Sequence, residues 1–147
     1  LDLNELSRNI IVDWISVLEN SNFDYAFDIP EAEYLMRIDA NAYSRILNNL
    51  LQNVLIHSKG NKIVFHVFED NLQAKITITD NGKGISPDHL PHIFERMYQC
   101  DQSRSAGGNG LGLSIVKELV AAHKGTITVD STPDRGTTFT LLLPKSL

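Results

Sequence analysis

The spacing of apolar residues changes several times along the chain, and each change marks a different kind of element. Residues 1–18 carry leucine, isoleucine and tryptophan at helical spacing, which predicts an amphipathic helix. Residues 23–29 instead alternate between apolar and polar, as a strand does, and Pro30 ends the run. A short second strand is expected at residues 34–38, directly before Asp39, which is a good N-cap for the next helix.

The helix predicted next, at about residues 40–57, combines a broad apolar stripe with polar residues along one edge. Asn49, Asn53 and His57 are four residues apart and therefore line that edge. An unsatisfied buried amide costs about 1–3 kcal/mol, so each asparagine needs a polar partner. Both amides could cap nearby backbone groups. Alternatively, an amide oxygen here could hold a hard cation such as Mg²⁺, which prefers oxygen ligands.

Two alternating runs, at residues 62–69 and 72–80, predict a hairpin with its turn at residues 70–71. The second run ends in the sequence D-N-G-K-G-I at residues 80–85. Asn-Gly after an alternating run favours another hairpin turn, whereas the Ser-Pro-Asp that follows is typical of a helix start. In the second interpretation, the Asp80 carboxylate could accept a hydrogen bond from an exocyclic amine, while the glycines leave room for a flat ring.

A glycine-rich junction with a helix, G-G-N-G-L-G at residues 107–112, lies in the last third of the chain. Backbone N–H groups uncovered by side chains at the start of a helix suit a bound phosphate, although an ordinary loop entering a helix is the alternative. The spacing is neither that of a P-loop nor that of the dinucleotide fingerprint. Arg104, just upstream, is either a phosphate contact or a solvated surface residue. The elements expected here are a short helix at 91–98, a mobile polar loop at 99–108, a helix at 110–123 closed by Lys124-Gly125, and a hairpin of strands at 126–131 and 137–143.

Composition and charge limit the classes of function. At 147 residues, 42% of them hydrophobic, the chain is long enough for one domain with a core, spanning residues 1–147. The net charge of −5 gives no support for nucleic-acid binding, and a polyanionic ligand must be held by local groups. A single cysteine, Cys100, fits a reducing compartment, and no apolar run is long enough to insert into a membrane. The start at Leu1 rather than methionine suggests a piece of a longer protein.

Five short motifs, taken in order, resemble those of the catalytic and ATP-binding domain of sensor histidine kinases, within the GHKL superfamily that includes gyrase, Hsp90 and MutL ATPases. They are N-L-L-Q-N at 49–53 (the N-box), D-N-G-K-G-I at 80–85 (the first glycine box), I-F-E-R-M-Y at 93–98 (the F-box), G-N-G-L-G-L at 108–113 (the second glycine box) and G-T-T-F at 136–139. Each motif alone is weak, but together they cover nearly the whole chain. The resemblance implies an α/β fold, a two-layer sandwich known as the Bergerat fold. It would have a mixed sheet, helices on one face and residues 99–108 as a mobile lid over ATP.

The resemblance also implies roles for individual residues. Asp80 would accept a hydrogen bond from the adenine amino group, with Gly84 giving the ring room and Thr137 joining the network. Asn53 would coordinate a Mg²⁺ ion that bridges the phosphates, and Asn49 and Arg104 would complete the catalytic group. Further nucleotide contacts are expected from His57, Gly82, Lys83, Ile85, Phe94, Gly108, Gly110, Leu111, Gly112 and Leu113.

The function that the resemblance implies is phosphoryl transfer in a two-component signalling system. The γ-phosphoryl group of Mg·ATP would pass to a histidine on a separate helical dimerisation domain of the same kinase, with a response regulator downstream. None of the five histidines of this chain has the sequence context of that phosphoacceptor, so the chain would not phosphorylate itself alone. The expected location is the cytoplasm, with the parent kinase anchored in a membrane.

Departures from the family pattern keep two alternatives open. Val54 and Ile56 stand where many members have an alanine and a basic residue, so a phosphate contact would have to come from His57, Lys83 or Arg104. A non-catalytic nucleotide-binding module is therefore one alternative. A hydrolytic ATPase is less favoured, because Asn49 occupies the position where gyrase and Hsp90 relatives have a glutamate that polarises water.

Overall fold

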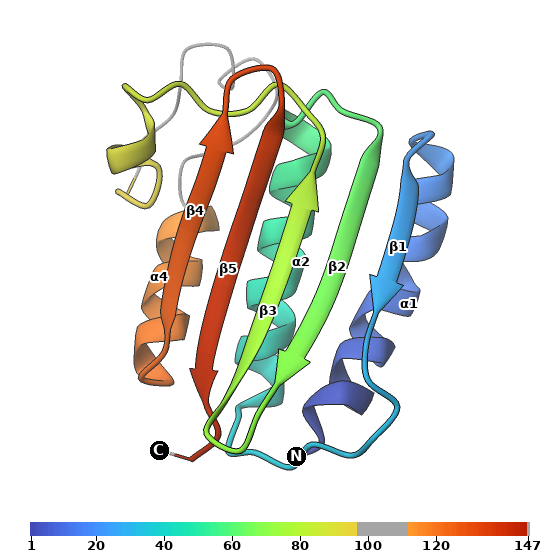
Figure 1. Ribbon diagram of the computed structural model, residues 1–147, viewed down its shortest axis with the longest axis vertical. Coiled ribbons are helices and arrows are strands. Elements are labelled where there is room, and N and C mark those ends of the chain that lie inside the picture. The colour runs from blue at the N-terminus through green and yellow to red at the C-terminus, as the bar shows by residue number, and fades with distance from the viewer. Residues whose placement is uncertain (97–111, 147) are drawn as a thin grey trace.

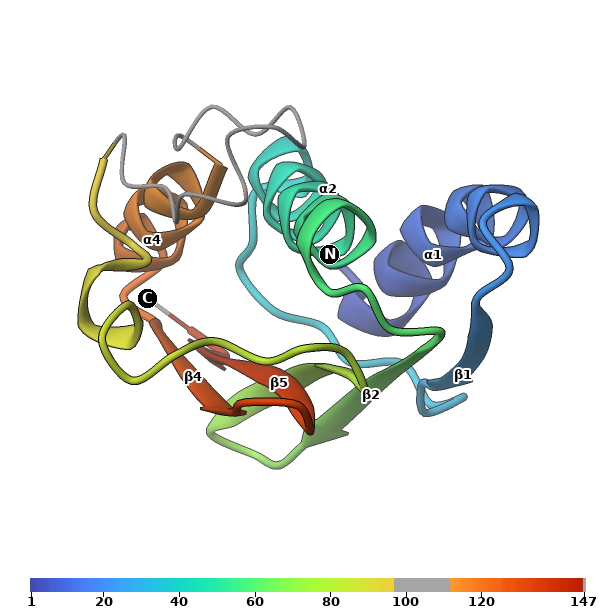
Figure 2. The same cartoon turned by 90° about the horizontal axis from the view of Figure 1, so that it is seen from above.

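The computed structural model describes residues 1–96 and 112–146, which form two layers (Figures 1 and 2). One layer is a five-stranded sheet in the order β1-β2-β3-β5-β4, and the α-helices all cover the same face of it. The helices are α1 (Leu3–Asn20), α2 (Ala40–His57) and α4 (Gly112–Ala122), with a 3₁₀ turn η1 at Leu90–His92. The strands are β1 (Asp24–Asp28), β2 (Lys62–Glu69), β3 (Gln73–Asp80), β4 (Thr126–Thr132) and β5 (Gly136–Pro144). The predicted two-layer α/β sandwich is confirmed.

Strand pairing brings distant motifs to one end of the sheet. β1 runs parallel to β2, whereas the other neighbouring strands are antiparallel, so the sheet is mixed as expected. β3 lies in the middle, and its last residue, Asp80, pairs with Ile63 on one side and with Thr137 on the other. Because Ile63 follows the end of α2 by a few residues, the end of the N-box helix and the starts of the first glycine box and the last motif all lie at this edge.

The core lies between the helices and the inward face of the sheet. The stripe predicted for α2 is buried there, and the helix has the predicted bounds, with Asp39 as its N-cap accepting a hydrogen bond from the Ala42 amide at 2.9 Å. The central strands contribute every second residue to the core, as the strand period requires. These buried residues are Ile63, Phe65, Val67, Ala74, Ile76, Ile78, Phe139, Leu141 and Leu143. None of the helices within residues 1–96 and 112–146 is long and apolar enough to cross a bilayer.

The strand expected at residues 34–38 is absent. Leu35 forms only an isolated bridge with Asp2, flanked by backbone hydrogen bonds on either side. The pairing stops there because Asp2 is the N-cap of α1, and the next residue, Leu3, begins the helix. An alternating sequence is therefore not enough to form a strand when the partner segment turns into a helix after two residues.

The ends of two predicted helices also differ from expectation. Of the helix expected at 91–98, the described part contains η1 followed by turns, held by i→i+3 bonds such as His92 N–H to the His89 carbonyl. The end of α4 was expected at Lys124-Gly125, and it is Lys124 rather than the glycine that has the left-handed φ of 57°. Gly125 is required for another reason, because a Cβ there would lie 2.4 Å from the Leu142 carbonyl oxygen.

Candidate functional site

The loop after β3 is folded against the C-terminal end of α2. The Gly82 amide donates to Asp80 Oδ1 at 2.8 Å, and the Lys83 amide donates to the Ser58 carbonyl at 2.6 Å. Asn81 Oδ1 accepts from the Asn61 and Lys62 amides, which fastens the loop to the start of β2. The chain does not return as a strand, so the hairpin interpretation of the Asn-Gly sequence is wrong.

Asp80 combines burial with several hydrogen-bond donors. Its side chain is at the end of the central strand, and the residue is only 6% exposed. Burial raises the pKa of the Asp80 carboxyl, while hydrogen bonds from the Gly82 amide, the Ser58 hydroxyl and the Thr137 amide favour its ionised form. The donors hold the carboxylate in one orientation, and a buried acceptor of this kind suits recognition of an N–H group.

The glycines of this loop are required by backbone packing. A Cβ on Gly82 would lie 2.0 Å from the Ser58 carbonyl oxygen, and one on Gly84 would lie 2.2 Å from the Thr132 carbonyl oxygen. Gly84 and Gly136 also have positive φ values of 72° and 122°. The resemblance suggested that Gly84 gives an adenine ring room; the contact that the structure gives it is with the turn after β4.

We expect Gly82→Ala to destabilise the fold by about 1–3 kcal/mol, because the methyl group would push α2 and the loop apart. Gly112→Ala is the matched control, since no described atom beyond its chain neighbours and its own helix lies within 4 Å of the position of its Cβ. Its thermal midpoint should be unchanged or slightly higher, as alanine favours helix. Thermal unfolding of the nucleotide-free variants measures both effects. Equal midpoints for the two variants would contradict the packing account.

A hydroxyl pair supports the other side of the loop. Ser131 and Thr137 are paired across β4 and β5, with their hydroxyl oxygens 2.9 Å apart. Ser131 Oγ also accepts from the Ile85 amide at 2.7 Å and donates to the Gly136 carbonyl at 3.0 Å. Strand register thus places Thr137 beside Asp80, and their shared role towards adenine stays a prediction.

The N-box residues line one side of α2. Asn49 Nδ2 donates to the Gly112 carbonyl at 3.4 Å, which joins the middle of α2 to the first turn of α4. The amide of Asn53, one turn further on, is half-buried and has no hydrogen-bond partner among the described residues. The cap interpretation therefore holds for Asn49 in part, whereas it gains no support at Asn53.

His57 ends the same row. Its Nδ1 is buried and has no hydrogen-bond partner in the described part of the chain. Burial, and secondarily the charge of Lys83, lower the pKa of the His57 imidazole. The ring is thus held neutral in the free protein, next to a lysine that belongs to the first glycine box.

Part of the predicted site falls outside the described residues. Arg104, Gly108, Gly110 and Leu111 are in that part, as is the lid expected at residues 99–108. Gly112 is the first residue of α4, and Leu113 is half-buried behind it.

Phe94, from the F-box, packs edge-on against Phe139 at 6.3 Å between ring centroids. The Lys117 ammonium group of α4 lies over the Phe94 ring, 5.8 Å from its centre. Phe94 is thus placed as a packing anchor between the sheet and α4.

Residues 38–147 match the family described as histidine kinase-, DNA gyrase B- and HSP90-like ATPase. The chain belongs to this family. Sensor histidine kinase RppB of Synechocystis is 32% identical over 97% of this chain and 32% of its own length, and sensor histidine kinase YcbM of Bacillus subtilis is 33% identical over 97% and 47%. The catalytic domain of histidine kinase ThkA, in a nucleotide-free form, superimposes with a TM-score of 0.84 and 26% identity, covering 100% of this chain and 97% of that one. Sequence and fold thus identify a sensor histidine kinase ATP-binding catalytic domain, and the chain spans a third to a half of these two curated relatives.

Reasoning from the sequence missed two residues that build this histidine kinase site. Ser58 accepts from the Lys83 amide and also, through Oγ, from the Gly60 amide at 3.0 Å. Ser131 holds both Ile85 and Thr137. A signal was present for Ser131, because a hairpin with its turn at 133–136 places it opposite Thr137. No local pattern distinguishes Ser58, because its contacts depend on how the loop folds back.

Proposed function

We propose that residues 1–147 form one catalytic domain that binds Mg·ATP and transfers its γ-phosphoryl group to a histidine on a separate helical dimerisation domain of the same kinase. A response regulator would then take the phosphoryl group from that histidine. The observation that carries the proposal is the buried Asp80 carboxylate, held by the Gly82 amide at the point where α2, β3 and β5 meet. Membership of the ATPase family supports use of an adenine nucleotide.

The described residues fit an adenine nucleotide at both of its ends. Asp80 supplies a fixed, buried acceptor for the adenine amino group. The hydroxyl of its strand partner Thr137 is held by a hydrogen bond with Ser131. At the other end, Gly112 begins α4 without a side chain, and no other described group lies within 4 Å of the position of its Cβ. Backbone N–H groups at the start of a helix favour phosphate. Gly82, Gly84 and Ile85 would hold the base side, and Phe94 of the F-box and Leu113 of α4 would support it.

Asn53 is the residue that we assign to Mg²⁺. Its half-buried amide, without a partner among the described residues, faces the same side of α2 as Asn49. An amide oxygen is a hard ligand of the kind that Mg²⁺ prefers, and this ion commonly keeps several waters beside one or two protein ligands. When bound, Mg²⁺ neutralises phosphate charge and aligns the transferred group.

Positive charge near the phosphates must come from residues other than position 56, which is isoleucine. We assign this charge to Lys83 and Arg104, and further hydrogen bonds to the neutral His57 imidazole and to the backbone N–H groups of Gly108, Gly110 and Leu111. Phosphoryl transfer depends mainly on positioning and on charge neutralisation. Cations elsewhere in the site can therefore replace the basic residue that is missing at position 56.

Asn49 favours transfer over hydrolysis. Its amide donates to the Gly112 carbonyl and cannot accept a proton from water. The acceptor imidazole supplies its own nucleophile, so a kinase domain needs no base at this position. A hydrolytic ATPase would need another carboxylate there. A non-catalytic nucleotide-binding module, suggested by Val54 and Ile56, is the second candidate.

Mixing this domain with the purified dimerisation domain of its parent kinase, in Mg·[γ-³²P]ATP, separates the three functions. We expect acid-labile, alkali-stable label on the partner's histidine, and none when the partner carries glutamine at that position. Free phosphate released without the partner would instead establish hydrolysis. Nucleotide binding with neither product would establish the regulatory module and overturn the kinase proposal.

We also propose that this domain lies in the cytoplasm and that its parent kinase is anchored in a membrane.

A further inference from the structure

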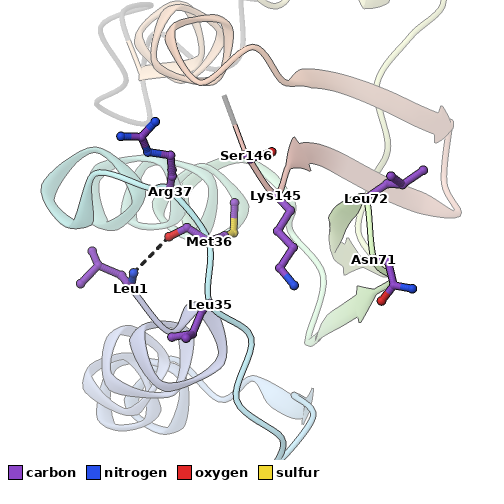
Figure 3. A pocket seen from close by; sticks show the side chains of 8 residues that line it. All are labelled: Leu1, Leu35, Met36, Arg37, Asn71, Leu72, Lys145 and Ser146. Atoms are coloured by element: carbon purple, nitrogen blue, oxygen red, sulfur yellow. Dashed lines mark hydrogen bonds between the residues drawn. The ribbon is translucent and has the colours of Figure 1, made fainter.

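A hollow lies at the end of the sheet opposite to Asp80. It has a volume of about 440 Å³ and is lined by residues at the start of α1, in the 34–38 segment, in the turn between β2 and β3, and after β5. Figure 3 shows Lys145 in the middle, with Leu1 and Leu35 on the α1 side and Leu72 on the hairpin side. Asp80 ends β3 while Leu72 precedes it, so the length of the strand separates this hollow from the nucleotide site.

Exposed leucines gather at this hollow. Leu35 and Leu72 are 54% and 80% exposed, and Leu1, the first residue of the sequence, lines the hollow beside Leu35. Single exposed leucines are common on soluble proteins, but several around one concavity indicate an interaction site. Met36, buried at the base, gives the hollow an adaptable apolar floor.

The charge of the hollow is opposite to that of the chain. Arg37 and Lys145 line it and none of its lining residues is acidic, although the chain as a whole has a net charge of −5. Lys145 lies 4.9 Å above the Tyr34 ring, and Arg37 has no ion-pair partner among the described residues. Two cations without carboxylates beside exposed leucines complement a ligand that is both acidic and apolar.

The floor of the hollow is held by backbone hydrogen bonds between four segments. Leu1 and Met36 exchange N–H···O bonds, the Arg37 amide donates to the Lys145 carbonyl at 3.1 Å, and the Lys145 amide donates to the Leu72 carbonyl at 2.9 Å. A surface fixed in this way loses little conformational entropy when a ligand binds.

We propose that this hollow binds an acidic amphipathic peptide segment of a partner protein, with apolar side chains between the leucines and carboxylates on Arg37 and Lys145. A concave site of this size admits a few side chains, as a peptide presents them. An anionic membrane fits less well, because two cations in a hollow of an acidic domain cannot offset repulsion from the lipid surface. This inference is independent of the nucleotide site.

Fluorescence anisotropy with a short labelled peptide that alternates leucine and aspartate tests the proposal on the 147-residue chain. We expect saturable binding below about 1 mM, with amide NMR shifts concentrated at Leu35, Arg37 and Leu72. Arg37→Glu should weaken binding about five- to tenfold, because it replaces attraction by repulsion. Leu72→Asp should weaken it at least about tenfold by removing the apolar contact and adding like charge. All these residues are exposed, so thermal midpoints should not move.

Val12→Asp is the matched control, since Val12 is 57% exposed on α1 and does not line the hollow. It should bind the peptide as the unmodified chain does. Equal binding of a leucine–lysine peptide, or shifts elsewhere on the domain, would overturn the proposal. So would binding to phosphatidylserine vesicles in place of the peptide. Self-association abolished by Arg37→Glu, with no peptide binding, would assign the surface to a second copy and likewise overturn it.

Discussion

Asp80→Asn is expected to lower the affinity for ATP by roughly 10–150-fold while the fold remains intact. The carboxylate is the acceptor that we assign to the adenine amino group, and a hydrogen bond to a charged partner contributes about 1.5–3 kcal/mol. Asparagine keeps an oxygen for the Gly82 amide but presents an NH₂ group in place of the second oxygen. That group would face either the adenine amine or the Thr137 amide, and neither can accept its hydrogens.

The same substitution should change the free energy of unfolding by no more than about 1 kcal/mol at neutral pH. Burial of the ionised Asp80 carboxyl is costly, and removing the charge relieves this cost, while one lost hydrogen bond offsets the gain. Because burial raises the folded-state pKa above the unfolded value of 3.8, the unmodified chain loses stability as pH rises between these two values. The variant has no such loss, so its stability relative to the unmodified chain should fall on acidification through that interval.

Isothermal titration with Mg·ATP and thermal unfolding at several pH values measure the two effects separately. Asp130→Asn, an exposed position on β4, is the control for removing a negative charge and should bind ATP normally. If Asp80→Asn bound ATP with unchanged affinity, Asp80 would have no part in recognising the base. If it unfolded at neutral pH, the loss of binding would say nothing about adenine, and Asp80→Glu would be needed to separate the two.

Elements whose pattern reflects long-range burial could be predicted from the sequence. The extent of α2 follows from its apolar stripe, which packs on the sheet. Its first residue follows from the Asp39 cap, which hydrogen-bonds within the first turn. The strand predicted at residues 34–38 is absent. Alternation is a property of the segment alone, whereas a strand also needs a partner segment of equal length. The helix expected at 91–98 is replaced, in its described part, by η1 and turns, and the packing of Phe94 on Phe139 is a contact across the fold that local spacing does not encode.

The nucleotide site could be predicted as a set of residues but not as an arrangement. The motif order pointed to Asp80 and Thr137, and only strand register shows that they are direct partners. The packing reason for a glycine at position 84 could not be predicted either. It is the close approach of the Thr132 carbonyl, at the end of β4 and far along the chain. The link from Asn49 to Gly112 required two helices to pack side by side, which no spacing within either helix encodes.

Asn53→Ala should reduce phosphoryl transfer to the partner histidine by about 100–1000-fold, because a misplaced metal ion leaves phosphate charge uncompensated in the transition state. The fold should tolerate the change. The Asn53 amide has no hydrogen-bond partner among the described residues, and alanine is the best helix former. Affinity for ATP measured without magnesium should therefore remain, while the gain in affinity on adding magnesium should disappear.

Gln52→Ala is the matched control on the same helix, since Gln52 is exposed and adjacent to Asn53 in sequence. It should transfer phosphoryl groups at the normal rate, and both variants should unfold near the midpoint of the unmodified chain. A full response to magnesium in Asn53→Ala would show that the ion is held by other groups. The row of polar residues on α2 would then act on the phosphates through Asn49 and His57 alone, and the missing cation at position 56 would become the more serious departure for catalysis.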